Sequence, residues 1–120
     1  MIFKFYKYQG TGNDFIIADN RKAEYNLSTE KVKELCDRRF GIGADGLMLL
    51  NQKPGFDFEM KYYNADGKEG SMCGNGGRCM SKFAYHLGIH REVYRFLASD
   101  GIHEAEIDME GIVSLKMKDV

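Results

Sequence analysis

The chain has 120 residues, and 43% of them are hydrophobic, which is enough for the core of one ordinary domain but not of two. Its formal net charge of −1 provides no electrostatic footprint for nucleic acid or for an anionic membrane surface. No apolar run approaches the length of a membrane span, and the N-terminus lacks the pattern of a secretory signal, so a cytoplasmic protein with no membrane or nucleic-acid partner is expected.

The N-terminal part of the chain predicts two strands followed by a helix. β-rich runs at Ile2–Tyr8 and Asp14–Ala18 are separated by the glycine-containing turn 10–13. Ser28 is suited to be the N-cap of the first helix, and Gly41 is expected to end it. The apolar stripe of this helix consists of Val32, Leu35 and Cys36.

The middle of the chain predicts two more strands and a second helix. Gly46–Asn51 is a short apolar strand, and residues 56–63 alternate apolar and polar side chains, with Tyr63 on the polar side, as a half-buried strand does. The second helix runs from about Asn75 to Leu87. It is expected to be largely wrapped by sheet because much of its surface is apolar. The apolar residues are Met80, Phe83, Ala84, Tyr85 and Leu87.

Three further strands are predicted at Tyr94–Ala98, Ile102–Met109 and Ile112–Met117, the last two joined by a turn at Glu110-Gly111. Strands outnumber helices, and short turns connect many of them. An α+β fold with a mostly antiparallel sheet therefore fits better than a parallel βαβ sheet.

The segment with the clearest chemistry is the glycine-rich turn that leads into the second helix. Cys73 comes directly before this turn, and the N–H groups and dipole of a helix N-terminus favour thiolate over thiol. The same N–H groups can hold a carboxylate or an oxyanion. Such a turn supplies a base or nucleophile together with an anion cradle, which suits chemistry next to a carboxylate.

The other cysteines and histidines are better explained by packing. Cys36 and Cys79 fall on helical positions that point into a core, and His103 lies in a strand beside apolar residues. Three cysteines, an odd number, argue against a disulfide framework. The order Cys73, Cys79, His86, His90 has the spacing C-x5-C-x6-H-x3-H, which is unlike a zinc finger, so no metal is expected.

Two asparagines in turns are candidate ligands for ammonium and carboxylate groups. They are Asn13, in the first turn, and Asn64, at the end of the alternating strand. For either residue alone, a purely conformational role in the turn is the more common explanation.

Together these segments resemble one known family. The chain contains, in order, Gly-Thr-Gly-Asn-Asp-Phe at 10–15, Arg-Arg-Phe-Gly-Ile-Gly-Ala-Asp-Gly at 38–46, Asn-Ala-Asp-Gly at 64–67 and Met-Cys-Gly-Asn-Gly-Gly-Arg-Cys at 72–79. This set resembles diaminopimelate epimerase, at family spacing and over the whole chain. The resemblance implies a two-domain amino-acid epimerase that needs no pyridoxal phosphate or other cofactor. Each domain is a sheet around a central helix, and the site lies between the domains.

The resemblance also implies roles for five residues. Cys73 resembles one of the family's two catalytic thiols, and Gly74 and Asn75 resemble positions whose backbone N–H groups hold the substrate α-carboxylate. Asn13 and Asn64 resemble side-chain contacts to the substrate, diaminopimelate. Gly46 falls where some family members carry a substrate-contacting glutamine, and glycine cannot supply that contact.

The family's second thiol belongs to a C-terminal domain that this sequence does not contain. Residues 1–120 are therefore expected to be the N-terminal domain of an epimerase on the lysine and peptidoglycan route, with half a site and no activity alone. An uncovered cleft face would favour self-association, with a homodimer as one outcome. The alternatives are a proline racemase-like or phenazine isomerase-like relative, a non-catalytic amino-acid-binding module, and an assembly domain for the other half.

Overall fold

The computed structural model describes residues 2–10, 12–70, 74–107 and 113–116. Within them, the secondary-structure elements in chain order are β1 (Tyr6–Gly10), β2 (Asn13–Asp19), α1 (Thr29–Cys36), β3 (Gly46–Asn51), β4 (Phe58–Asn64), α2 (Gly74–His86), β5 (Val93–Ala98), β6 (Gly101–Ile107) and β7 (Val113–Lys116).

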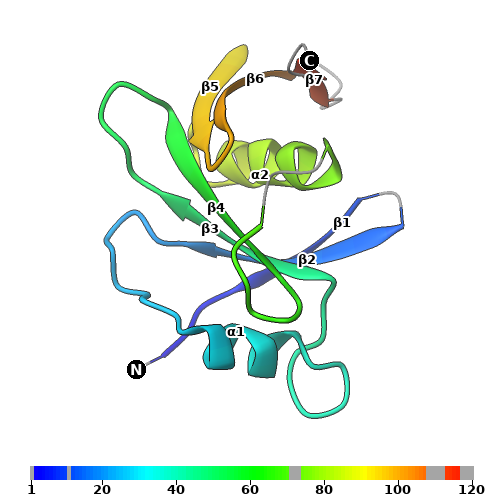
Figure 1. Cartoon of the computed structure of the whole chain (residues 1–120). Coiled ribbons are helices and arrows are strands. Elements are labelled where there is room, and N and C mark those ends of the chain that lie inside the picture. Colours follow the sequence, from blue (N-terminus) through cyan, green and yellow to red (C-terminus); the bar gives the residue numbers. More distant parts are fainter. Residues whose placement is uncertain (1, 11, 71–73, 108–112, 117–120) are drawn as a thin grey trace.

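The strands form one mixed sheet in the order β1-β2-β3-β4-β5-β6-β7. Four neighbouring pairs are antiparallel, and only β2/β3 and β4/β5 are parallel. α1 connects the two strands of the first parallel pair, and α2 connects the two strands of the second. The sheet curls around α2, while α1 packs on its outer face (Figure 1). The predictions of an α+β fold and of a mostly antiparallel sheet around a central helix are therefore confirmed.

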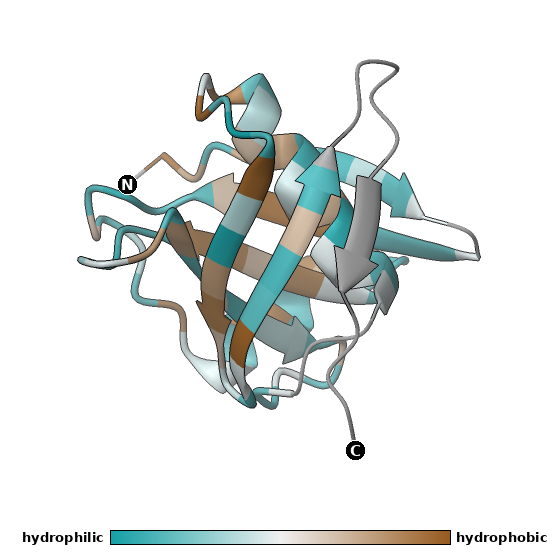
Figure 2. Ribbon diagram, turned by 90° about the horizontal axis from the view of Figure 1, so that it is seen from above, coloured by the Kyte–Doolittle hydropathy of each residue, from teal (hydrophilic) through white to brown (hydrophobic). Residues whose placement is uncertain are grey.

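The inner core lies between α2 and the concave face of the sheet. The buried face of α2 presents Met80, Phe83 and Ala84, which are at most 1% exposed, to side chains of the surrounding strands. Hydrophobic residues are concentrated along the strands, whereas the loops are largely hydrophilic (Figure 2). This packing fixes the position of α2, and therefore of its N-terminus, relative to the sheet. Strand residues of this core are Phe15, Ile17, Met48, Leu50, Phe58, Met60, Tyr94, Phe96 and Ala105.

A second core lies on the outer face, beneath α1. Ser28 caps α1 as predicted, because its hydroxyl oxygen accepts a hydrogen bond from the Lys31 N–H at 3.1 Å. Val32 and Cys36 are buried on the stripe that the sequence indicated. Both faces of β2 and β3 are therefore covered, which accounts for their continuous apolar runs. Strand residues of this core are Ile16, Ala18, Leu47, Leu49 and Tyr63.

Two details of the sequence prediction were wrong. Tyr63 is buried beneath α1, not on a solvated face of β4, because the outer core covers this end of the strand. Tyr85 is 45% exposed and lies outside the buried stripe of α2, where its ring packs on His90 with centroids 4.4 Å apart.

Several boundaries also differ. β1 begins at Tyr6, and α1 ends at Cys36, where Asp37 becomes extended, well before Gly41. The predicted turn at Glu110-Gly111 lies outside the described residues. Neither helix within the described ranges has the length and hydropathy needed to cross a membrane.

Candidate functional site

The sheet register gathers three of the sequence motifs at one end of the sheet. Asn13 begins β2, Gly46 begins β3, and Asn64 ends β4. Gly46 pairs with Phe15 on one side and with Asn64 on the other. Because β2 and β3 are parallel and β4 runs against them, these three termini meet at the same edge.

The N-terminus of α2 lies at this same edge. The Asn75 side-chain amide donates a hydrogen bond to Asn13 Oδ1 at 2.9 Å, across 62 positions of sequence. A Cβ atom added at Gly10, the last residue of β1, would lie 3.1 Å from the Asn75 Cβ. The first turn of the helix is therefore packed directly against the β1–β2 hairpin, and Gly10 permits this close approach.

The amides of Asn13 and Asn75 belong to a directed chain of hydrogen bonds. Arg78 Nη1 donates to Asn75 Oδ1 at 3.2 Å, and the Asn13 amide nitrogen lies 3.4 Å from Asp45 Oδ2. A guanidinium can only donate and a carboxylate can only accept. Arg78 and Asp45, at the two ends of this series of hydrogen bonds, therefore fix which way each amide points. The side-chain amides of Asn13 and Asn75, at the N-terminus of α2, are thus held in one orientation.

A cluster of charged side chains surrounds Asp45, the last acceptor in this series of hydrogen bonds. Arg38 donates to both oxygens of Asp14, at 2.8 and 3.1 Å, and to Asp45 Oδ1 at 3.0 Å. Lys7 Nζ lies 3.1 Å from Asp14 Oδ2. Hydrogen bonds from Arg38, and to a lesser extent from Lys7, hold the pKa of Asp14 below its ordinary value, although partial burial opposes the shift.

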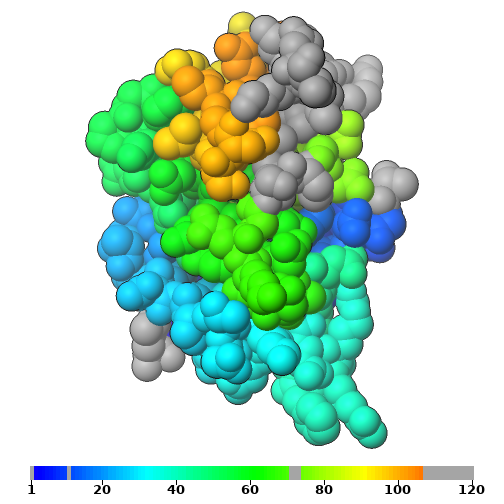
Figure 3. Space-filling model, viewed as in Figure 1, coloured from blue at the N-terminus to red at the C-terminus, as the bar shows by residue number. Residues whose placement is uncertain are grey.

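The charge cluster fixes the segment between α1 and β3, which projects from the body of the molecule (Figures 1 and 3). The Asp45 N–H donates to Asp14 Oδ1 at 3.0 Å, and the Asp14 N–H donates to Asp45 Oδ2 at 3.1 Å. Exposed ion pairs of this kind add little to stability. Their effect here is to hold Asp45 beside Asn13.

Asn64 lies at the same end of the sheet, in a turn that is fixed by its own backbone. Its N–H donates to the Lys68 carbonyl at 2.9 Å, and its carbonyl accepts from the Gly67 N–H at 2.9 Å. A Cβ added at Gly70 would lie 2.7 Å from the Asn64 amide nitrogen, so Gly70 closely approaches this side chain, although Asn64 itself remains exposed.

The structure therefore brings Asn13, Asn75 and Gly74, the first residue of α2, together and places Asn64 at the same edge. Cys73 lies outside the described residues. Sequence reasoning gave no role to Arg38, Asp14 or Asp45. The sequence did contain an indication of their importance, because Asp14 lies in the motif at 10–15 and both Arg38 and Asp45 lie in the motif at 38–46.

The two cysteines assigned to packing are in the cores, as expected. Cys36 is 3% exposed and Cys79 is 5% exposed. Burial raises the pKa of the Cys36 thiol to about 11, so this sulfur is protonated at neutral pH.

We expect native protein to leave Cys36 and Cys79 unmodified by iodoacetamide at pH 8, because alkylation requires an accessible thiolate. Peptide mapping of the folded protein before and after addition of urea measures this, with the urea sample as the control in which both are labelled. Rapid modification of either residue in the folded protein would contradict their placement in the cores.

No metal centre was found within the described ranges, where no three His, Cys, Asp or Glu side chains group suitably. His103, expected in a core or edge, is 4% exposed. Its Nε2 lies 2.8 Å from Asp100 Oδ1, and its Nδ1 has no hydrogen-bond partner in the described part of the chain.

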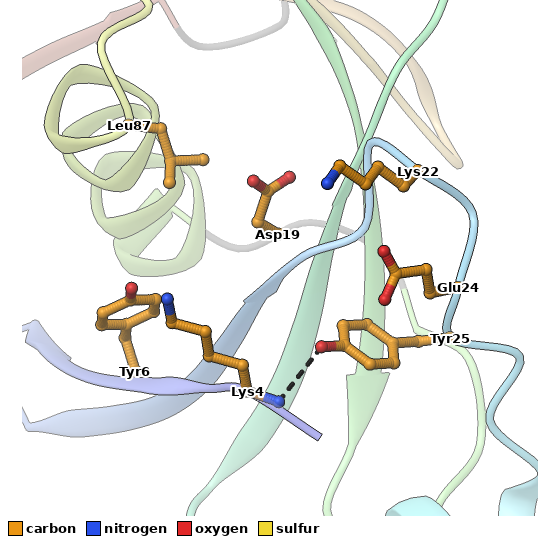
Figure 4. Close-up of a pocket in the computed structure, with 7 residues that line it drawn as sticks. All are labelled: Lys4, Tyr6, Asp19, Lys22, Glu24, Tyr25 and Leu87. Carbon is orange, nitrogen blue, oxygen red and sulfur yellow. Dashed lines mark hydrogen bonds between the residues drawn. The ribbon is translucent and has the colours of Figure 1, made fainter. Parts of the chain in front are cut away.

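A hollow of about 240 Å³ lies at the opposite end of β2 from Asn13, beside Asp19. It carries two lysines and two carboxylates, so no single charge predominates in it. This hollow is separate from the edge where the motifs meet. Figure 4 shows its lining residues, which are Lys4, Tyr6, Asp19, Lys22, Glu24, Tyr25 and Leu87.

Solved structures of other proteins share this α+β fold. A Bacillus anthracis phenazine biosynthesis protein of the PhzF family superimposes with a TM-score of 0.63 at 17% identity, over 92% of this chain and 37% of that one. A methylitaconate-delta-isomerase superimposes with a TM-score of 0.58 at 15% identity, over 84% of this chain and 57% of that one. At such identities the likeness establishes the fold alone.

Sequence comparison is more specific. The family model for diaminopimelate epimerase matches residues 5–120. A diaminopimelate epimerase from Flavobacterium psychrophilum is 54% identical over 98% of this chain and 46% of its own length. One from Chlorobaculum tepidum is 52% identical over 90% of this chain and 43% of its own. The chain belongs to the diaminopimelate epimerase family, and it spans less than half the length of these relatives.

Proposed function

We propose that the full-length protein containing this chain interconverts LL- and meso-diaminopimelate by cofactor-independent proton transfer at Cα. The observation that best supports this is the hydrogen bond between Asn75 and Asn13. It joins the N-terminus of a helix, where an α-carboxylate binds favourably, to a side-chain amide from the first motif. Family membership supports the choice of substrate, since the matched relatives are named diaminopimelate epimerases.

In this proposal Cys73 is the base on one face of the substrate. Its thiolate removes the Cα proton, the bonding electron pair remains on Cα and spreads into the carboxylate, and Cys73 becomes a neutral thiol. An acid on the opposite face then donates a proton to Cα, which inverts the configuration. Two groups are needed because a single base would return the proton to the face it came from.

The carboxylate accumulates negative charge while Cα is a carbanion. Gly74 and Asn75 are the first two residues of α2, where backbone N–H groups have no acceptor within the helix. In this proposal they donate to the substrate carboxylate. Donors fixed before the reaction stabilise the developing charge without reorganising. Asn13 and Asn64 supply further side-chain contacts to the substrate.

In this proposal the acid on the opposite face of the substrate comes from outside residues 1–120. Cys36 and Cys79 cannot supply it because both are buried in the cores. The proposal therefore assigns residues 1–120 to the N-terminal domain, and the second thiol to a further domain that closes over the site and excludes water. Homodimerisation of the full-length protein is compatible with this arrangement.

The test is incubation of the full-length protein with LL-diaminopimelate in deuterated water. We expect conversion to the meso isomer with deuterium at the inverted Cα, and no conversion by residues 1–120 alone. Chiral chromatography with mass spectrometry measures both. Binding of diaminopimelate by the full-length protein without inversion would support a non-catalytic module instead. Inversion at an enzymatic rate by residues 1–120 would contradict the half-site assignment.

A further inference from the structure

Tyr62 occupies the space that a side chain at Gly46 would fill. A Cβ added at Gly46 would lie 3.0 Å from the Tyr62 hydroxyl oxygen and 3.2 Å from its Cε2. Both distances are shorter than ordinary contacts to a Cβ, and the carbonyl oxygen of Tyr63 would lie closer still, at 2.9 Å. A side chain at Gly46 would therefore crowd both the backbone of β4 and the phenol. No role was assigned to Tyr62 from the sequence.

The phenol points toward the edge of the sheet where the motifs meet. The Tyr62 backbone pairs with Met48, two residues inside β3, yet its hydroxyl reaches Gly46 at the end of that strand. Tyr62 lies two positions before Asn64 in β4, so both side chains leave the same face of the sheet. This is the face that packs against α2.

The ring is held in this direction by its neighbours. It meets the ring of Phe15 edge to face, with centroids 6.2 Å apart. On another side, a Cβ added at Gly70 would lie 3.2 Å from the Tyr62 Cδ1. Tyr62 remains partly exposed, whereas Phe15 is buried. These contacts fix the ring, and the hydroxyl oxygen therefore has a defined place beside Gly46.

We propose that Tyr62 is a further substrate-binding residue of this site, and that its hydroxyl hydrogen-bonds a charged group of the amino-acid substrate. This inference rests on the proposed function, because it takes the edge formed by Asn13, Gly46 and Asn64 to be the substrate site. A phenol can donate to a carboxylate or accept from an ammonium group, and both groups are present in an α-amino acid. Gly46 has a supporting role because it carries no side chain that would crowd the Tyr62 phenol.

The experiment measures binding separately from catalysis. In full-length protein carrying Cys73→Ala, which blocks proton transfer in the proposed mechanism, calorimetry gives the Kd of LL-diaminopimelate with and without Tyr62→Phe. Loss of a hydrogen bond to a charged group is expected to weaken binding about 10-fold or more. In protein that retains Cys73, Tyr62→Phe is expected to raise KM for the same substrate by a similar factor.

Tyr63→Phe is the matched control. Tyr63 is the next residue of the same strand, but it is buried in the outer core beneath α1. We expect this change to leave both Kd and KM within about twofold of the parent protein. Unfolding midpoints in urea show whether either variant alters the fold.

Each outcome decides the assignment. A Kd for Tyr62→Phe within twofold of the parent overturns it, as does equal weakening in both variants, which would indicate a structural effect. Wild-type protein that binds diaminopimelate but does not invert it refutes the proposed function, while the Kd comparison still decides the role of Tyr62. Absence of any binding by the parent protein overturns both.

Discussion

Replacing Cys73 by alanine in the full-length protein is expected to lower kcat for diaminopimelate epimerisation by about 10³-fold or more. Positioned general acid–base groups contribute roughly 10²–10⁴-fold to a rate. Here the lost thiolate is the only base proposed on its face of the substrate, and alanine leaves no group to take its place. The rate is measured as deuterium incorporation at Cα during conversion of LL- to meso-diaminopimelate.

Cys36→Ala is the control for this substitution, because it also removes one sulfur but from the core beneath α1, where the side chain is 3% exposed. We expect it to reduce stability while leaving kcat close to that of the wild type. If the Cys73→Ala enzyme kept full turnover, the thiol could not be the base. If Cys36→Ala were equally inactive, loss of structure would explain both results.

The elements with strong local signals were predictable from the sequence. The bounds of β3, Gly46–Asn51, were predicted without error, because a short apolar run is enclosed by a glycine and polar residues. The N-cap at Ser28 was also correct, since capping depends only on residues within one turn. The family resemblance assigned Asn13, Asn64 and the start of α2 to one substrate site, and periodicity gave no indication of this; that they meet at one edge of the sheet is seen only in the structure.

Features that depend on tertiary packing were not predictable. The burial of Tyr63 requires a second core on the outer face of the sheet, and no local pattern in β4 reveals that α1 covers it. The bond between Asn13 and Asn75 spans 62 positions, so only the assembled sheet and helix define it. The same holds for the Tyr62 phenol, whose place depends on a missing side chain in the neighbouring strand.

Gly67→Ala is expected to destabilise the protein by about 3 kcal/mol or more, which would make it one of the most damaging single substitutions in the chain. Gly67 has a φ of +87°, and an added Cβ would lie 2.1 Å from the carbonyl oxygen of Thr29, at the start of α1. The new methyl group would force this turn away from α1. Asn64 would move with it, because the Gly67 N–H donates to the Asn64 carbonyl at 2.9 Å.

Gly55→Ala separates the steric contribution from the conformational one. Gly55 has nearly the same backbone conformation, with a φ of +86°, but nothing lies within 4 Å of its added Cβ. It should therefore lose only about 1 kcal/mol, which is the ordinary disadvantage of an L-residue at positive φ. Urea unfolding of both full-length variants measures the difference. Equal losses would show that Thr29 does not confine the turn, whereas a larger loss at Gly67, with a raised KM for diaminopimelate, would connect the packing of α1 to the position of Asn64.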